Sequence, residues 1–198
     1  APYYGGMMRG REAIERVVRL DGIDTVLDIG SWNGLHANYF REKGFTVSTV
    51  DFNVKADFTG NYLDIDFPNK FDCIWCSHTL EHQHNVGIFL TKCFNDLNDN
   101  GVFAVTVPSR RKYGDKVVDG HVTYWNAGVL LYNLIVNGFD CSKAMVGTYN
   151  DEVSVVVRKK QAKLPRLSGD RGELDRLSKF FPMPIKQGFD GNILKVNW

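Results

Sequence analysis

The chain has 198 residues, of which 43% are hydrophobic, 24% are charged and 13% are aromatic. This length predicts a single domain and excludes a multidomain machine, and the composition excludes an intrinsically disordered chain. The 24 basic and 23 acidic residues give a net charge of +1, so we expect neither nucleic acid nor a membrane as a partner. We expect a cytoplasmic protein, because no apolar run reaches the roughly 20 residues of a membrane span and the N-terminal segment lacks the apolar centre of a signal peptide.

The first half of the chain alternates amphipathic and compact apolar segments. Periodicity predicts helices over 11–20 and 35–41 and extended segments over 25–29, 46–50, 58–61 and 73–76. In the second half it predicts helices over 85–97 and 126–138, a buried strand over 102–107, and two strands over 139–146 and 152–158 joined by a turn at 148–151.

Strands and helices alternate five times before the final strand pair, which predicts an α/β fold of the Rossmann-like, doubly wound type with a mostly parallel sheet and a terminal antiparallel hairpin. We expect one domain over 1–160 and a basic, proline-containing extension over 161–198 with a helix near 173–181. Ligands of such sheets bind beyond the carboxyl ends of the strands. The segments placed there are 30–34, 51–53, 61–64, 77–82 and 109–125.

The first strand ends in VLDIGSWNG, and the second ends in Asp51, followed by Phe52. Gly30 and Gly34 allow a sharp turn into a helix and the approach of a cofactor to the loop amides. A carboxylate at the position of Asp51 suits the two hydroxyls of an adenosine ribose, and Phe52 offers a flat face for adenine. This order of strand, glycine loop, helix, strand and acid favours a nucleoside-containing ligand, although a turn glycine and a capping aspartate would explain each residue singly.

Three blocks of the sequence, over about residues 10–160, resemble the class I S-adenosylmethionine-dependent methyltransferases. They are VLDIGSWNG, the pair FDCIWCSHTLEH and FLTKCFNDLNDNGVFAVTVPS, and GHVTYWNAGVLLYNLIVNGFD. The resemblance implies this fold, methyl transfer and S-adenosyl-L-methionine as cofactor. One departure is Trp32, which stands where the family usually has a second glycine, so its side chain must turn away from the cofactor.

The resemblance also implies which residues surround the cofactor. Around the methionine part it places Asp28, Gly30, Ser31, Asn33 and Gly34, with Cys76 and Ser77 at the methionine backbone. Around the nucleoside it places Asp51 and Phe52 at the ribose and adenine, and Asn61 and Tyr62 at the adenine edge.

Two short patterns suggest metal chemistry, and we expect neither to hold a metal. Cys73 and Cys76 form a CxxC inside an apolar strand, where residues three apart point to opposite faces. His78 to His82 fit the HxxEH pattern of some zinc peptidases, with His84 as a further candidate ligand. That pattern requires a helix, and here His78 directly follows a predicted strand.

The acceptor is expected to be a small molecule or a glycan. If it is a hydroxyl, a neutral His82 or His121 could take its proton during attack. The alternative is structural: His82 buttresses a helix and His121 pairs with a backbone carbonyl. Arg110 and Arg111 follow the fifth strand and could bind an anionic group of the acceptor, or simply form a solvated charged loop.

Two other functions fit parts of the sequence. A nicotinamide-dependent dehydrogenase would share the glycine loop and the acid, but it would have GxGxxG where this chain has GSWNG. A noncatalytic module could keep the nucleoside pocket without an acceptor site.

Overall fold

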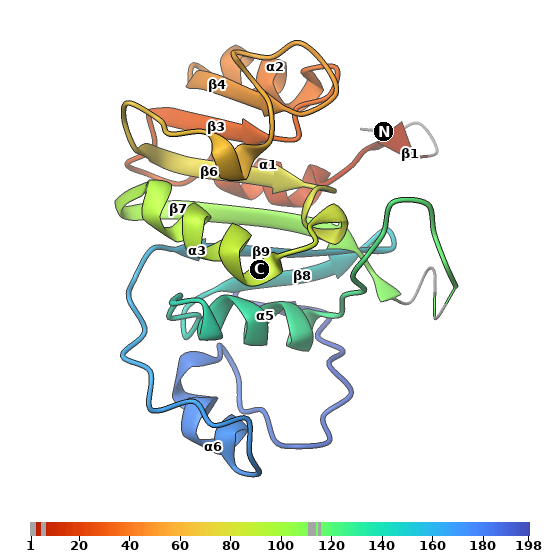
Figure 1. The fold of residues 1–198 in the computed structure, drawn as a ribbon, viewed down its shortest axis with the longest axis vertical. Helices are drawn as coiled ribbons and strands as arrows, with labels where there is room; N and C mark the ends of the chain where they lie inside the picture. Colours follow the sequence, from red (N-terminus) through yellow and green to blue (C-terminus); the bar gives the residue numbers. More distant parts are fainter. Residues whose placement is uncertain (1–2, 5–6, 111–113, 115) are drawn as a thin grey trace.

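The computed structural model describes residues 3–4, 7–110, 114 and 116–198, and the helices and strands alternate along most of this length (Figure 1). The elements of the first half are β1 (Tyr3–Tyr4), β2 (Met7–Met8), α1 (Arg11–Val17), β3 (Thr25–Ile29), α2 (Leu35–Glu42), β4 (Thr46–Asp51), β5 (Phe58–Thr59), the 3-10 turn η1 (Tyr62–Asp64) and β6 (Phe71–Ser77). Those of the second half are the 3-10 turn η2 (Leu80–His82), α3 (Val86–Asp96), β7 (Leu97–Pro108), α5 (Ala127–Val136), β8 (Met145–Tyr149), β9 (Glu152–Arg158), α6 (Glu173–Leu177), the 3-10 turn η3 (Ser178–Phe180) and β10 (Lys195–Val196).

An eight-stranded sheet forms the centre of the described structure, in the order β10-β8-β9-β7-β6-β3-β4-β5. The pairs between β5 and β7 are parallel, and β9, β8 and β10 join the other edge by antiparallel pairing. The expected Rossmann-like sheet with a terminal antiparallel hairpin is therefore confirmed.

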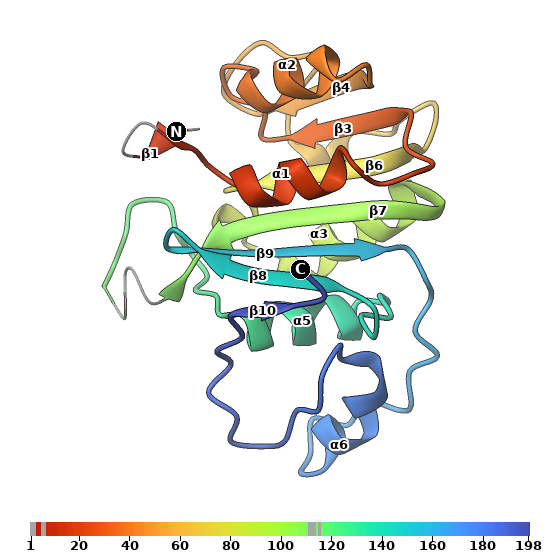
Figure 2. The same cartoon turned by 180° about the vertical axis from the view of Figure 1, so that it is seen from behind.

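Helices cover both faces of this sheet. On one face, α1 and α2 pack through residues such as Ile14 and Phe40 against Trp75 of β6. On the other face, α3 and α5 pack through residues such as Phe89 and Leu131. Figure 1 shows α3 and α5 in front of the sheet, and Figure 2 shows α1 on the opposite side.

Side chains of β6 point alternately to the two faces of the sheet, and this separates the two cysteines of the CxxC pattern. Cys73 belongs to the core beneath α1 and α2, whereas Cys76 belongs to the core beneath α3 and α5. Both are free, fully buried thiols, and burial raises their pKa above the ordinary range. Since they lie on opposite faces, they do not form a shared metal or redox site, as the strand geometry predicted.

Two sequence expectations were wrong in detail. The strand predicted over 139–146 begins only at Met145, because residues 139–144 turn: the amide of Ala144 donates to the carbonyl of Cys141. The turn predicted over 148–151 is shorter, since only Asn150 and Asp151 have left-handed φ angles, of 46° and 63°. The hairpin connection therefore has two residues, which suits the twist of the strands.

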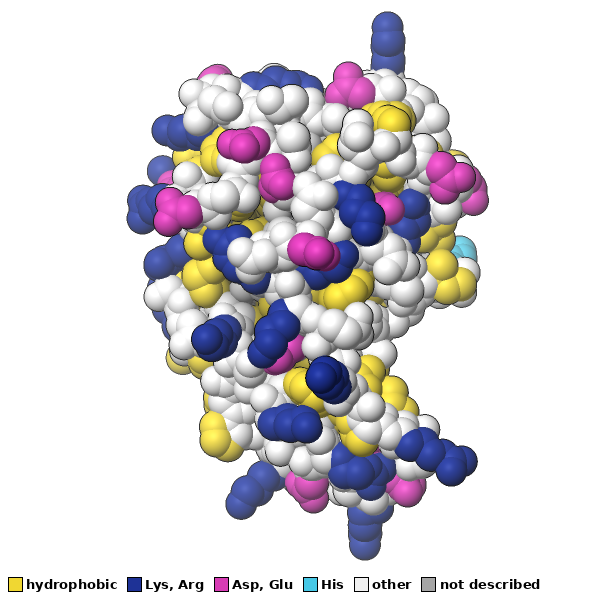
Figure 3. Space-filling model, turned by 90° about the vertical axis from the view of Figure 1, so that its left-hand side faces the viewer, with side chains coloured by type: hydrophobic (Ala, Val, Ile, Leu, Met, Phe, Trp, Pro, Cys, Tyr) yellow, Lys and Arg dark blue, Asp and Glu magenta, His cyan; other side chains and the backbone are white. Residues whose placement is uncertain are grey.

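Residues 161–198 leave the sheet after β9, form α6 and η3, and return to the sheet as β10. Leu177, Phe180 and Phe181 join the core beneath α5, and β10 pairs with β8 at the sheet edge. The side chain of Trp198 donates to Glu12 on α1. Basic side chains of this extension remain exposed: Lys163, Arg166, Arg171, Arg176, Lys179 and Lys186. Figure 3 shows Lys and Arg gathered over the lower end of the molecule.

Over the described ranges, the structure has no helix with the length and hydrophobicity needed to cross a lipid bilayer.

Candidate functional site

A cavity of about 790 Å³ opens beyond the carboxyl ends of β3, β4 and β6. The chain runs from β3 to β4 on one side and later places β6 on the other side, so this is the switch point at which doubly wound sheets bind ligands. Eight of the residues predicted for the site line this cavity: Gly30, Ser31, Asp51, Phe52, Asn61, Tyr62, Ser77 and His82.

The glycine loop after β3 is packed tightly against its neighbours. Gly30 has a φ of 77°, and a Cβ placed there would collide with the hydroxyl of Thr79. The amides of Gly30 and Ser31 donate to the carbonyl of Val50 at 2.8 and 3.1 Å. These amides hold the loop on β4, which differs from the expectation that they face the cofactor.

Asp51 lies at the centre of the loop region and is nearly buried. Its carboxylate accepts the amides of Trp32 and Asn53 at 2.8 Å and that of Val54 at 3.1 Å. Phe52 is 71% exposed and lines the cavity, so its ring face is accessible to a base. Trp32 has a left-handed φ of 46° and is half exposed at the cavity wall.

Asn61 and Tyr62 lie at the far wall but have structural partners as well. Asn61 caps η1 by accepting the amide of Leu63 at 3.2 Å. Tyr62 is buried and donates its hydroxyl to Asp96 at 2.7 Å, and burial raises the pKa of the phenol. Their contribution to cofactor binding remains a prediction.

Four residues that the resemblance placed at the cofactor do not line the cavity: Asp28, Asn33, Gly34 and Cys76. Asp28 is buried, and burial raises the pKa of its carboxyl to about 7. Gly34 begins α2 with a φ of 76°, while Asn33 accepts the amide of Leu35.

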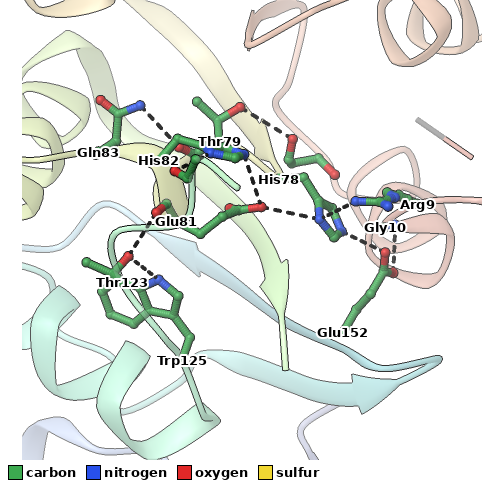
Figure 4. A network of polar contacts seen from close by, with 12 residues as sticks. Arg9, Gly10, His78, Thr79, Glu81, His82, Gln83, Thr123, Trp125 and Glu152 are labelled. Atoms are coloured by element: carbon green, nitrogen blue, oxygen red, sulfur yellow. Dashed lines mark hydrogen bonds and ion pairs between the residues drawn. The ribbon is translucent and has the colours of Figure 1, made fainter. Parts of the chain in front are cut away.

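A polar network joins three distant segments at the edge of the cavity (Figure 4). His78 Nε2 lies 2.7 Å from Glu152 of β9, and the other oxygen of Glu152 accepts the amide of Gly10. Arg9 Nη1 lies 2.9 Å from His78 Nδ1. Burial opposes the charged form of His78, but hydrogen bonds with Glu152 and Glu81 outweigh it and raise its pKa.

His36 closes the same edge from α2. It is buried, lines the cavity and contacts the carbonyl of Arg9 at 2.9 Å. Burial lowers its pKa to about 4, so His36 is a neutral donor to that carbonyl at physiological pH.

The two predicted catalytic histidines lie side by side. His82 and His121 have ring centroids 5.0 Å apart, almost perpendicular to each other. His82 Nδ1 donates to the carbonyl of Gly120 at 2.7 Å, so a backbone carbonyl fixes the orientation of this ring. Burial lowers the pKa of His121.

The peptidase interpretation of HxxEH does not fit this geometry. His78 precedes η2 and has a left-handed φ of 53°, and η2 spans only Leu80–His82. The pattern needs both histidines on one helix. The ring of His78 is instead directed to Glu152.

Arg110 follows β7, and its amide donates to the carbonyl of Trp125 at 2.7 Å. It lines a small depression beside the cavity, together with Glu81, Pro108, Ser109, His121, Thr123 and Tyr124. Arg111, the other predicted acceptor residue, lies outside the described residues.

Sequence analysis missed part of the site. Arg9, His36 and Glu152 were not singled out, and Glu81 was considered only as part of a peptidase pattern. Arg9 and Glu152 reach the cavity edge through tertiary contacts with His78, which lies 69 positions from Arg9 and 74 from Glu152, and no local pattern signals such contacts.

The polar atoms on the cavity wall suit S-adenosylmethionine. Two buried polar atoms on its wall, Ser77 Oγ and Arg9 Nε, have no hydrogen-bond partner among the described residues. Buried polar atoms are normally satisfied, so these two are available to a polar ligand. Asp51 offers a carboxylate as a hydrogen-bond acceptor, and Phe52 offers an exposed aromatic ring, which are groups that suit a ribose and a base.

Comparison with known proteins gives the same class. Residues 9–131, more than half of the chain, match the model of the methyltransferase domain family. The chain belongs to this family, and it is an S-adenosylmethionine-dependent methyltransferase of class I. No curated protein matched the chain.

Solved structures share the fold at low sequence identity. A Burkholderia thailandensis 1,6-didemethyltoxoflavin-N1-methyltransferase with bound S-adenosylhomocysteine has a TM-score of 0.64 and 20% identity, over 76% of this chain and 78% of that one. An Archaeoglobus fulgidus SAM-dependent methyltransferase has a TM-score of 0.59 and 16% identity, over 75% and 92%. A Haloferax volcanii complex of the Trm112 activator with a putative methyltransferase has a TM-score of 0.61 and 13% identity, over 78% and 89%.

Proposed function

We propose that the chain methylates a hydroxyl group of an anionic small molecule or glycan in the cytoplasm. The observation that supports this most is the position of His82, which lines the cofactor cavity and whose ring lies against that of His121 in the adjoining depression. An acceptor bound in the cavity beside His82 would have its hydroxyl near both rings, because the ring of His121 packs against that of His82. Four buried free cysteines suit a reducing compartment.

The cofactor supplies an activated methyl group, so the chain mainly has to align the acceptor oxygen with it. Asp51, Phe52, Ser77 and Arg9 are proposed to bind the cofactor from the walls of the cavity. Gly30 and the loop around it keep the wall close to that ligand. Asn61 and Tyr62 are proposed to contact the adenine edge.

We propose that the acceptor binds against two parts of the segment that follows β7, residues 109–110 and 118–125, which we call the acceptor side. A neutral His82 or His121 could accept the hydroxyl proton. Arg110, and Arg111 beyond it, are proposed to bind a phosphate or carboxylate of the acceptor through paired hydrogen bonds.

Methyl transfer can be tested directly with methyl-labelled cofactor and matched acceptors that do and do not carry an anionic group. We expect label in the anionic hydroxyl compounds. Arg110→Ala should raise the KM for the acceptor at least about tenfold, since a charge-assisted pair contributes about 1.5–3 kcal/mol, and leave cofactor affinity unchanged. An unchanged KM would remove Arg110 from the acceptor site.

A further inference from the structure

Three ligand-type side chains meet where the loop after β6 touches the acceptor side. Glu81 and His82 come from the segment after β6, and His121 comes from the segment after β7. One ligand atom from each lies within 4.8 Å of the other two. We expected no metal in the HxxEH segment because that pattern requires a helix and His78 follows a strand. The cluster described here leaves His78 out and takes its third member, His121, from a distant segment.

The orientation of His82 is fixed in the manner of a metal ligand. Because a carbonyl oxygen can only accept, Nδ1 of His82 carries the proton that bonds Gly120 at 2.7 Å. In the neutral ring Nε2 therefore presents its lone pair, and it faces the Glu81 carboxylate at 3.8 Å. Metal-binding histidines usually donate their other ring N–H to a carbonyl or carboxylate in this way.

Glu81 contributes a buried carboxylate to this cluster. Its side chain is only 1% exposed, and its Oε2 has no hydrogen-bond partner among the described residues. Its Oε1 lies 3.4 Å from His78 Nδ1 and 3.8 Å from His82 Nε2. Oε1 thus already has His78 as a partner, and Oε2 is the buried oxygen that lacks one. A buried carboxylate oxygen without a partner is costly, and a cation held by both oxygens of Glu81 would satisfy Oε2.

The backbone holds both loops in this arrangement. The carbonyl of Glu81 accepts the amides of Val122 and Thr123 at 2.9 and 3.3 Å. The indole of Trp125 donates to the Thr123 hydroxyl at 2.9 Å (Figure 4). The segment that carries His121 is thus attached to the residue that supplies the carboxylate.

We propose that Glu81, His82 and His121 bind a divalent first-row transition-metal ion. Two imidazole nitrogens and one carboxylate oxygen form a ligand set that suits Zn²⁺, Fe²⁺ or Co²⁺ and leaves coordination positions open. Metal–ligand bonds of about 2.0–2.2 Å place tetrahedral ligands about 3.3–3.6 Å apart, so ligand atoms that now lie within 4.8 Å of one another would move closer by up to about 1 Å on binding. His82 is 43% exposed, which leaves a path for the ion.

The inference rests on the proposed hydroxyl acceptor and refines the role of the two histidines. With the ion present they are ligands, and the ion holds the acceptor oxygen at an open position beside the cavity. The hydroxyl becomes more acidic and its proton passes to solvent. The oxygen–methyl bond then forms as the sulfur–methyl bond breaks, and the sulfonium becomes a neutral thioether.

Binding can be measured without activity. The protein is stripped with a chelator, dialysed and titrated with Co²⁺, whose visible absorption reports imidazole and carboxylate ligation, and elemental analysis after Zn²⁺ loading gives the stoichiometry. We expect one equivalent of either ion. Supporting residues typically contribute about 10–100-fold in metal affinity, so Glu81→Gln and His121→Ala should each weaken Co²⁺ binding by more than about 100-fold.

The matched control is His84→Ala, an exposed histidine on the same loop that does not belong to the cluster. It should bind Co²⁺ like the unaltered protein. Circular dichroism of each variant shows whether it is folded. Absence of Co²⁺ and Zn²⁺ binding in the folded protein, or unchanged binding in Glu81→Gln, would overturn the metal site.

Measurements with and without the ion separate the metal site from the proposed methyl transfer. S-adenosylhomocysteine binding by calorimetry and methyl transfer to the anionic hydroxyl panel are measured on chelated and Zn²⁺-loaded protein. Transfer of equal rate in both preparations contradicts the ion's role but keeps the proposed function. Cofactor binding without transfer to any panel member in either preparation contradicts the proposed acceptor.

Discussion

Asp51 shows how one side chain can hold its own loop together and still be available for a ligand. Its two oxygens accept three backbone amides, which use three of about four acceptor positions. The remaining capacity faces a cavity large enough for a nucleoside. We propose that the carboxylate binds the cofactor in addition to its structural role, and a substitution would then remove both.

We expect Asp51→Ala to weaken S-adenosylhomocysteine binding by about 1–3 kcal/mol, or roughly 5–150-fold in Kd. The reason is the loss of a charged acceptor for the ribose hydroxyls and of the loop anchor. Isothermal titration calorimetry measures it, with Asp66→Ala, an exposed aspartate outside the cavity lining, as the control. Tight NAD binding by the unaltered protein with no response to either sulfur nucleoside would contradict the cofactor site.

Asp28 is expected to make stability depend on pH. Its folded pKa of about 7 exceeds the unfolded value of about 3.9, so the folded state holds the proton more tightly. The free energy of unfolding should therefore fall between about pH 4 and pH 7 and level off above, by at most about 4 kcal/mol from this group.

The measurement is urea unfolding of the unaltered protein and of Asp28→Asn at several pH values from 5 to 8. The asparagine removes the charge and keeps the shape, so the stability advantage of the variant should grow as the pH rises. Curves that remain parallel over this range would show that Asp28 ionises in the folded protein as it does in the unfolded chain.

At the scale of elements, the loop between β3 and α2 depends on a glycine for two separate reasons. Gly30 has a left-handed backbone and no room for a Cβ beside Thr79. Gly22 has a similar φ of 74° but open space around it. Substitutions at both glycines therefore share the cost of a left-handed backbone, and only the substitution at Gly30 adds a collision with Thr79.

We expect Gly30→Ala to lower the free energy of unfolding by about 1–3 kcal/mol more than Gly22→Ala, because overpacking adds to the shared cost of a left-handed alanine. Denaturant titration of both variants gives the difference. Cofactor affinity should fall in Gly30→Ala alone. Equal losses of stability would mean that Thr79 moves aside at no cost.

The elements that the sequence predicted well are those with strong local patterns. The helix over 86–96 and the buried strand through 102–107 repeat apolar residues at helical or continuous spacing, and the structure contains both. Residues 98–101 lie between the predicted helix and the predicted strand, and they extend β7, because Leu97 pairs with Phe71 across an irregular step and Asn98 bonds Asp72. Such pairing depends on a partner strand that is distant in the sequence.

The candidate site divides in the same way. Gly30, Asp51 and Phe52 follow a strand in a recognisable order, and all three line the cavity. The contacts of Arg9 and Glu152 with His78 arise only when the N-terminal segment and the hairpin of β8 and β9 meet the end of β6. No pattern within one segment contains that information.

At the scale of the whole molecule, the extension packs into the same core and the same sheet as the rest of the chain. Phe180 and Leu177 are buried in the core shared with α5, and β10 adds to the central sheet. Trp198 lies against Gly147 of β8 and donates to Glu12, so the extension also reaches α1. We therefore propose one cooperative domain with 161–198 packed on it.

Phe180→Ala is expected to destabilise the entire chain by about 3–5 kcal/mol, the usual cost of removing a buried aromatic ring. Urea unfolding followed by tryptophan fluorescence and by far-ultraviolet circular dichroism should give coincident transitions. Lys163→Ala, an exposed residue of the same extension, serves as the control and should change stability little. An early, separate transition in the variant would show that the extension unfolds by itself.

The central position of β6 and β7 has a consequence for the way the molecule opens. Both strands are paired on each side and covered by helices on each face, so their amides should exchange with solvent only when the whole sheet unfolds. The segment that carries His82 continues directly from β6, and the acceptor side continues directly from β7. The proposed acceptor side is therefore attached to the most slowly exchanging part of the sheet, next to the cavity proposed for the cofactor.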